Sequence, residues 1–312
     1  MFTELPKLFD RDFAVGYLLP VIVWVGASLG LLDLFGFLAD VRRWLEGDLL
    51  LGATVVSLLA LLGAILLLTV NREILRFLEG YGAYNPLQVL LAWERQRLQA
   101  MDERIKVLDE KYQAEQRWSP EDALERNRLM RDRARLFPPA DHVLPTPFGN
   151  VIRAFEAYPA IMYGVDAIPA WPRLVMLMSK EARAQVDNAK AQMDFWINLA
   201  VLSGVLAGEY AAACVWVNQF RHPWLLLAAG FVGWLALARS LSSAISWGNT
   251  IRSAFDLYLP ELARKLRLPP QTSRAAEREL WARVSQAWIY GLPQVLPDPL
   301  VATPTPPADP EK

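Results

Sequence analysis

Glu209 is the residue whose type and position most directly suggest chemistry. It interrupts the apolar run 195–217 and lies 8 residues before its end, which is about 12 Å at the helical rise. An ionised carboxylate at that depth in a bilayer costs a few kcal/mol, so Glu209 should be neutral, paired or in contact with water. It could be a proton or cation site or line an oligomeric pore. Alternatively, it is a protonated side chain bonded to a neighbouring helix.

Two further charges adjoin apolar runs. Asp33 lies near the far end of the run 13–38, where an interfacial position is the simplest interpretation. Arg239 follows the run 223–238 and is the partner of Glu209 that charge alone suggests. By depth the two side chains miss each other by roughly 12 Å, so we do not expect this pair.

Two GxxxG motifs also lie in apolar runs. Gly26 and Gly30 form the first, and Gly204 and Gly208 form the second, directly before Glu209. Such motifs let helix backbones approach closely, either within one chain or between copies of it.

Five arginines within ten residues form the strongest polar feature. They are Arg126, Arg128, Arg131, Arg133 and Arg135. They could bind anionic lipid headgroups or a nucleic acid backbone. A solvated, ion-paired helix face is the simpler interpretation, because acidic residues are interleaved with them.

The composition excludes several classes of site. The net charge of −1 gives no overall attraction to nucleic acid. One cysteine and two histidines leave no thiolate cage and little for a histidine metal site. The chain has no Gly-Lys-Ser/Thr phosphate loop, no His-Glu-x-x-His pair and no dinucleotide fingerprint. We therefore expect no catalytic residues, metal or cofactor.

The elements that carry these residues are four apolar runs. Hydrophobic residues make up 54% of the chain, and a helix needs roughly 20 of them to cross a bilayer core. The runs are 13–38, 49–70, 195–217 and 223–238. The last is short unless its helix continues toward Trp247. The first is too long and lacks the cationic front of a cleaved signal peptide.

Basic residues set the expected orientation. Residues 71–193 carry 18 of the 32 Lys and Arg residues, so this segment and both termini should be cytosolic. The resulting fold class is an all-α membrane protein with two transmembrane hairpins and a helical cytosolic domain. The expected divisions are a first transmembrane hairpin (1–70), a cytosolic helical region (71–193), a second transmembrane hairpin (194–240), cytosolic C-terminal helices (241–292) and a Pro-rich disordered tail (293–312).

The cytosolic region begins with two predicted helices. Asn85-Pro86 starts one that runs to about Gln116, and Ser119-Pro120 starts another that ends before Pro138. A 3-4-3-4 spacing predicts a short coiled-coil seam and an antiparallel hairpin. The seam residues are Leu98, Met101, Ile105, Leu108 and Tyr112. Prolines throughout 138–172 predict a connector without a long helix. After the fourth run, a helix over 240–268 should be interrupted near Pro260.

Three motifs in the second half of the chain carry a resemblance. TPFGNVIRAFEAYP (146–159), MYGVDAIPAWPRL (162–174) and FDLYLPELARKL (255–266) resemble a group of uncharacterised bacterial membrane proteins. Those proteins similarly place a polar helical segment between two membrane hairpins. The resemblance implies a bacterial inner-membrane protein and no reaction.

Three functional hypotheses remain open from the sequence. The first is a non-enzymatic membrane scaffold or sensor that self-associates and binds an unknown cytosolic protein partner, with nucleic acid an unlikely ligand. The second is an oligomeric channel or membrane-permeabilising effector with Glu209 near the pore. The third is a membrane enzyme that uses cytosolic carboxylates.

Overall fold

Every regular element in the described part of the chain is helical. The computed structural model describes residues 10–39, 49–82, 84–115, 117 and 119–292, and no strand occurs among them. The predicted all-α class is therefore confirmed for these residues. The predicted disordered tail, 293–312, lies outside them.

Four helices are long and apolar enough to cross a bilayer, as predicted from the apolar runs. The first is a continuous path through α1 (Arg11–Phe13), the π-helical turn η2 (Ala14–Leu18) and α2 (Leu19–Leu34). The others are α4 (Leu49–Glu79), α9 (Lys180–Val217) and α10 (Trp224–Lys265). The fourth run, which is short by itself, is the first part of a helix of 42 residues.

The predicted interruption near Pro260 is wrong, because α10 continues through this residue to Lys265. A proline inside a helix removes one backbone hydrogen bond and costs about 3 kcal/mol. The side chains of Leu259 and Leu262, on either side of it, are buried. Burial of two leucines offsets a penalty of that size.

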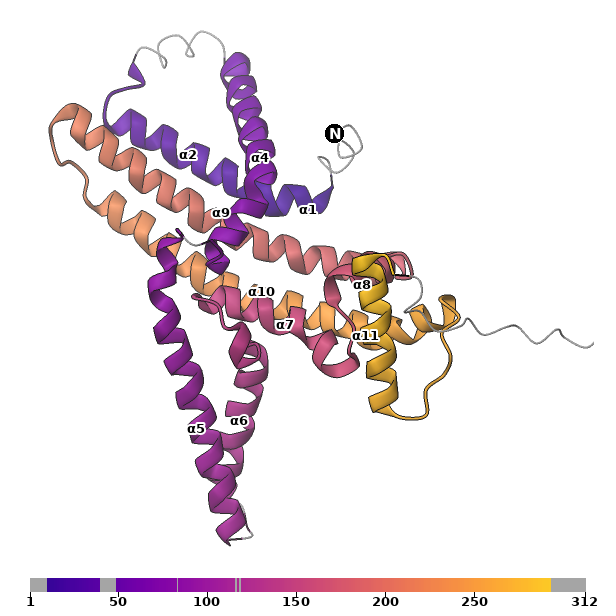
Figure 1. Cartoon of the computed structure of the whole chain (residues 1–312). Helices are drawn as coiled ribbons and strands as arrows, with labels where there is room; N and C mark the ends of the chain where they lie inside the picture. Colours follow the sequence, from indigo (N-terminus) through magenta and orange to yellow (C-terminus); the bar gives the residue numbers. More distant parts are fainter. Residues whose placement is uncertain (1–9, 40–48, 83, 116, 118, 293–312) are drawn as a thin grey trace, which may run out of the picture. The chain divides into compact units, whose positions relative to one another are not determined.

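The helices fall into two compact units. Unit one contains Met1–Ala154 and Ala184–Thr250, and unit two contains Phe155–Arg183 and Ile251–Lys312. Within unit one, α2 packs beside α4 (Figure 1). α2 and α9 run in the same direction, because Tyr17 contacts Asp194 and Ser28 contacts Glu209.

α5 (Leu91–Glu115) and α6 (Pro120–Leu136) form an antiparallel hairpin in unit one (Figure 1). Side-chain caps from Asn85 and Ser119 begin the two predicted helical segments, the first through the 3₁₀ turn η3 (Pro86–Leu90). Of the predicted seam, Leu98 and Leu108 are buried, whereas Tyr112 is exposed.

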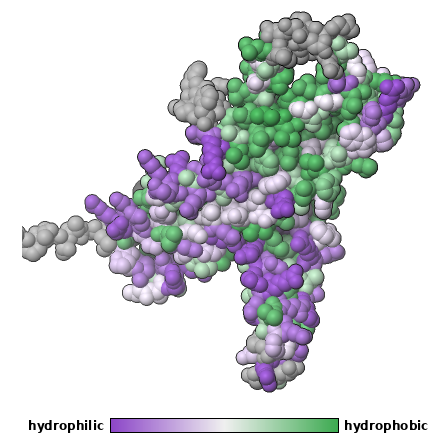
Figure 2. All heavy atoms as spheres, turned by 180° about the vertical axis from the view of Figure 1, so that it is seen from behind, coloured by the Kyte–Doolittle hydropathy of each residue, from purple (hydrophilic) through white to green (hydrophobic). Residues whose placement is uncertain are grey.

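Ion pairs join the two helices of the hairpin along both sides of that seam. They are Arg104–Glu125 and Lys111–Asp122, each at 2.6 Å, Arg133–Asp102 at 2.9 Å, and Arg126–Asp109. Figure 2 shows polar side chains over the hairpin and apolar side chains over the part of unit one that holds the long apolar helices.

The predicted connector is more helical than expected. After the short turn η4 (Ala140–His142), α7 (Pro147–Tyr163) spans 17 residues and contains Pro159. Burial favours this helix, since Val151, Ile152 and Phe155 are all buried. At Gly149 a Cβ atom would overlap the Glu79 backbone at the end of α4, so the two helices meet backbone to backbone.

Unit two contains the remaining short helices. α8 (Ala167–Val175) packs beside α11 (Arg274–Tyr290). The Asp166 side chain caps α8, and the Asp166 backbone N–H donates to Ser285 Oγ at 2.9 Å. Gly164, with φ of +79°, lies where a Cβ would overlap the Arg278 carbonyl.

Candidate functional site

A buried acidic side chain lies where three of the long apolar helices meet. Asp194 on α9 is 3% exposed, and its Oδ2 lies 2.6 Å from the Lys190 ammonium one turn earlier. The Tyr17 hydroxyl donates to the same oxygen at 2.9 Å, and Asn71 Nδ2 on α4 lies 3.5 Å from Oδ1. We call Tyr17, Asn71, Lys190, Asp194 and Asn198 the Asp194 cluster.

The local backbone explains why Asn198 belongs to this cluster. Pro20 has no N–H, so the Gly16 carbonyl four residues earlier lacks its usual helical donor. Asn198 Nδ2 donates to this carbonyl at 2.8 Å. The π-helical turn η2 spans the same region, and such turns are frequent at functional sites.

Close packing brings α9 onto this turn. At Gly16 a Cβ atom would lie 3.5 Å from both the Ala191 carbonyl oxygen and Asp194 Cβ. Glycine therefore leaves just enough space for the helix that carries the acid.

Two acceptors in the cluster are left without a donor. Asn71 Oδ1 and Asn198 Oδ1 are buried and accept no hydrogen bond in the described part of the chain. A buried, unsatisfied polar group costs about 1–3 kcal/mol. Lys190 is 38% exposed and connects the buried carboxylate to the surroundings. The cluster can hold a charge pair and accept further donors, but it contains no activated nucleophile.

The sequence analysis singled out none of these residues as a candidate site. Two signals could have revealed the cluster. Lys190 and Asp194 are four residues apart directly before an apolar run, and Asn71 directly follows the charge-free run 49–70. All three residues therefore lie next to the predicted cytosolic end of an apolar run.

Glu209 contacts a neighbouring helix, as one of the predicted alternatives stated. The Ser28 hydroxyl on α2 donates to Glu209 Oε2 at 2.6 Å. Arg239 is exposed and forms no ion pair with any described residue, so the structure does not bring it to Glu209. Asp33 is exposed near the end of α2.

Ser28 also lies in a Gly-x-Ser-x-Gly sequence, 26–30, the pattern of a hydrolase nucleophile elbow. That elbow requires a sharp strand-to-helix turn. Ser28 instead lies inside α2 and donates to a glutamate, so this match carries no hydrolase chemistry.

The GxxxG glycines make no close helix contact with the part of the chain that the structure describes. A Cβ atom at Gly26, Gly30, Gly204 or Gly208 would meet nothing within 4 Å. Tight packing against the described residues is therefore not their role, and self-association through them stays a prediction.

The polar groups of α2 and α9 do not form one continuous line. Asn198 and Glu209 are 11 residues apart on α9, about 16 Å at the helical rise. Between them, Leu202 is buried in a cluster with Val21 and Val25 of α2. Apolar packing thus separates the Asp194 cluster from the Ser28–Glu209 pair.

The arginine cluster divides into paired and unpaired members. Arg126 and Arg133 pair with Asp109 and Asp102 of α5, and Arg128 lies 3.8 Å from Asp132 on its own helix. Arg131 and Arg135 are exposed and form no ion pair with a described residue. The hairpin therefore uses part of the cluster for its own packing.

A second buried carboxylate lies where the hairpin joins the rest of unit one. Glu94 on α5 is fully buried, Asn150 Nδ2 on α7 donates to its Oε2 at 2.9 Å, and Arg97 lies 3.6 Å from its Oε1. Burial raises the pKa of Glu94 above its ordinary value, although Arg97 and Asn150 each favour the charged form.

Amide and hydroxyl side chains fix the turn that precedes the hairpin. Asn85 Nδ2 donates to the Phe77 carbonyl at 2.8 Å, and Gln88 Nε2 donates to the Gly80 carbonyl at 2.7 Å. The Thr146 hydroxyl donates to the Leu78 carbonyl at 2.7 Å. We call these contacts, with Glu94–Asn150, the hairpin joint.

In unit two, one carboxylate accepts hydrogen bonds from two tyrosine hydroxyls. The Tyr158 and Tyr163 hydroxyls donate to Asp256 Oδ1 at 2.9 and 2.7 Å. Burial, together with these bonds to an acid, raises the pKa of both tyrosines.

No group of three or more His, Cys, Asp or Glu side chains among the described residues could hold a metal ion.

Comparison with known proteins adds no further assignment. No family model matches the chain, and no curated protein or solved structure matches it either. The resemblance to bacterial membrane proteins therefore stays a prediction.

Proposed function

We propose that the protein is a non-enzymatic multi-pass membrane protein, a scaffold or sensor whose α5–α6 hairpin binds a cytosolic protein partner. The observation that carries the proposal is the hairpin joint. A hairpin held to the end of α4 by Asn85 and Gln88, and to α7 by the Glu94–Asn150 bond, has a fixed direction. Fixed direction is what a binding element on a membrane protein requires.

The surface of the hairpin is suited to such binding. Leu124 is 71% exposed and Val107 is 51% exposed, and Arg131 and Arg135 are not engaged in ion pairs with described residues. A hairpin surface that carries both exposed apolar side chains and arginines without ion pairs is suited to a protein interface, where arginine is enriched.

The polar groups of the long apolar helices support a scaffold over a conduction path. Asp194 and Glu209 on α9 accept hydrogen bonds from Tyr17 in η2 and Ser28 in α2, so both acids join α9 to the first long apolar helix. Apolar packing around Leu202 lies between them.

We further infer a bacterial inner-membrane location with both termini and the hairpin on the cytosolic side. The support is the excess of Lys and Arg in residues 71–193 and the motif resemblance. Labelling of single cysteines at Leu124 and at Trp216 with an impermeant maleimide tests this, in Cys214→Ser. We expect labelling of intact cells at 216 and not at 124.

Photo-crosslinking in native membranes tests the partner. A benzoylphenylalanine at Leu124 or Val107 should capture the same cytosolic protein. Leu58, which is 55% exposed on the apolar face of α4, is the control position. The captured protein, once purified, should bind the full-length chain in nanodiscs. Leu124→Asp should weaken that binding about tenfold, or about 1.4 kcal/mol. Capture that is equal at all three positions, or affinity that Leu124→Asp leaves unchanged, would reject the hairpin as the binding element.

An oligomeric channel is the second candidate, favoured by the open faces of the GxxxG glycines. Proton and cation flux into liposomes distinguishes it. The channel requires flux that Glu209→Gln changes, whereas the scaffold predicts no flux from either protein.

A further inference from the structure

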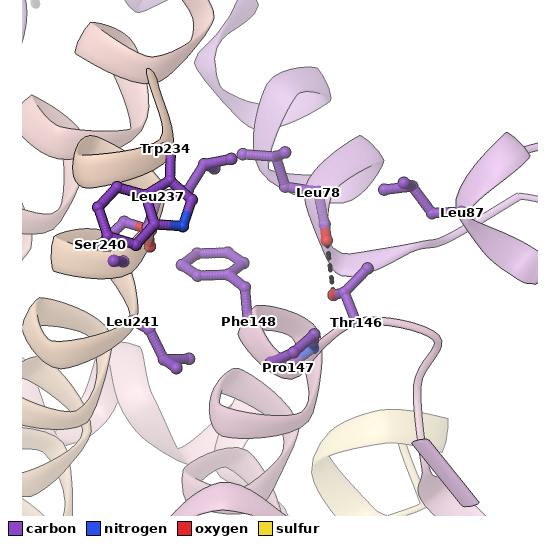
Figure 3. Close-up of a pocket in the computed structure, with 10 residues that line it drawn as sticks. Leu78, Leu87, Thr146, Pro147, Phe148, Trp234, Leu237, Ser240 and Leu241 are labelled. Atoms are coloured by element: carbon purple, nitrogen blue, oxygen red, sulfur yellow. Dashed lines mark hydrogen bonds between the residues drawn. The ribbon is translucent and has the colours of Figure 1, made fainter. Parts of the chain in front are cut away.

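A cavity of about 350 Å³ lies in unit one beside the hairpin joint. Its walls come from α4, η3, α7 and α10 (Figure 3). The apolar side chains that line it include Leu78, Leu87, Phe148, Trp234, Leu237 and Leu241. Figure 3 shows the Phe148 ring pointing from the start of α7 toward the Trp234 ring on α10.

The chemistry of the lining selects an apolar occupant. Its two hydroxyl groups are already used, since Thr146 donates to the Leu78 carbonyl at 2.7 Å and Ser240 donates to the Leu237 carbonyl at 2.8 Å. The indole N–H of Trp234 forms no hydrogen bond with a described residue, and the side chain is 64% exposed. The site thus offers hydrocarbon walls and one donor at its mouth.

The cavity continues the apolar outer face of α10. Leu227, Phe231 and Trp234 are exposed and follow each other at spacings of four and three, so they share one face of the helix. The same spacing leads on to Ala238 and Leu241 inside the cavity. If α10 crosses the bilayer, as the proposed function requires, this face contacts lipid chains and guides one of them into the cavity.

We propose that this cavity binds one acyl chain of a membrane glycerolipid, with the Trp234 indole N–H donating to the ester carbonyl. A glycerolipid supplies both features that the site accepts, a long apolar chain and an acceptor oxygen at one end. Leu87 belongs to η3, so the occupant also contacts the start of the hairpin.

Native mass spectrometry of the full-length chain tests the proposal. The protein, purified in mild detergent, is offered phosphatidylcholine and phosphatidylglycerol with identical chains. Ala238→Phe fills the cavity from an exposed helix position, and Ala228→Phe, also exposed on α10, is the matched control. We expect one retained lipid in the wild type and in Ala228→Phe, at least a fivefold loss in Ala238→Phe, and no headgroup preference.

A second variant keeps the test decisive if Ala238→Phe folds poorly. Trp234→Phe keeps an apolar wall and removes the donor, and it should reduce retention two- to fivefold. Retention unchanged in both variants would overturn the proposal. A strong headgroup preference would also overturn it, because recognition would then lie on charged residues. A dimer that Ala238→Phe dissociates, without retained lipid, would assign the cavity to a second copy of the chain.

These outcomes are separable from those of the proposed function. Resistance of each variant to carbonate extraction reports membrane insertion, and the hairpin crosslinks report partner binding. A variant that loses the lipid but keeps membrane insertion and the hairpin crosslinks would bear on the cavity alone and not on the proposed function.

Discussion

Removal of one hydroxyl from Tyr17 is the most direct test of the Asp194 cluster. Tyr17→Phe deletes the donor that lies 2.9 Å from Asp194 Oδ2. The ring itself should stay in place, since it stacks on Phe13 with centroids 6.0 Å apart. The substitution therefore isolates one hydrogen bond between α9 and the start of the first long apolar helix.

The structure sets the size of the expected effect. A hydrogen bond to a charged group contributes about 1.5–3 kcal/mol. After the substitution, Asp194 keeps the Lys190 ammonium at 2.6 Å, so the carboxylate is not left unpaired. We therefore expect Tyr17→Phe to lower the free energy of unfolding by about 1.5–2 kcal/mol, near the lower end of that range.

Lys190→Met should cost more, because it removes the counter-charge of a carboxylate that is 3% exposed. Breaking a fully buried pair costs about 3–5 kcal/mol. Lys190 is 38% exposed, which lowers the expectation to about 2–3 kcal/mol.

Reversible unfolding in mixed detergent and dodecyl sulfate micelles measures these differences. A double-mutant cycle of Tyr17→Phe with Asp194→Asn should give a coupling energy of about 1–2 kcal/mol. Leu58→Ala, on the exposed face of α4, controls for micelle effects. A coupling energy near zero would refute the bond, and a Lys190→Met loss smaller than that of Tyr17→Phe would refute the ranking.

Three further predictions concern other parts of unit one. Burial raises the pKa of Glu94 in the folded protein, so its ionisation above that pKa opposes folding and the penalty disappears as the pH falls to the ordinary glutamate range. The melting temperature of the wild type should therefore rise relative to Glu94→Gln on acidification, and a constant difference would contradict this. Gly149→Ala should destabilise the protein by about 1–3 kcal/mol because its Cβ meets backbone, whereas Gly204→Ala should leave unfolding of the monomer unchanged or slightly stabilised. Equal effects in denaturant titrations would contradict the packing at Gly149. Arg133→Ala should lower hydrogen-exchange protection of the hairpin by about 1 kcal/mol, because an ion pair with α5 is lost. Arg135→Ala, on the same helix without such a pair, should not.

The long helices could be predicted from sequence because they depend on composition alone. An uninterrupted apolar run such as 49–70 must be helical and must avoid water. The hairpin was equally accessible, since Asn85 and Ser119 cap the segments that form it. These are local signals that need no knowledge of the partner helix.

The site could not be predicted in the same way. Tyr17 and Asp194 are 177 positions apart, and Ser28 and Glu209 are 181 apart. Which residues face each other depends on the rotation and register of α2 against α9. The predicted interruption at Pro260 was wrong for a related reason. The free-energy cost of the proline inside the helix is smaller than the free energy gained by burying Leu259 and Leu262.

The carbonyl of Gly16 has a consequence for biogenesis. Its donor, Asn198, is encoded 182 residues later, and a ribosome adds about 5–20 residues per second. For about 10–35 s, the nascent first segment carries a carbonyl and a phenol whose eventual partners do not yet exist. A membrane protein in that state should stay beside the insertion machinery, or at shallow depth in the bilayer. Its first segment would then reach its final position only when the third arrives.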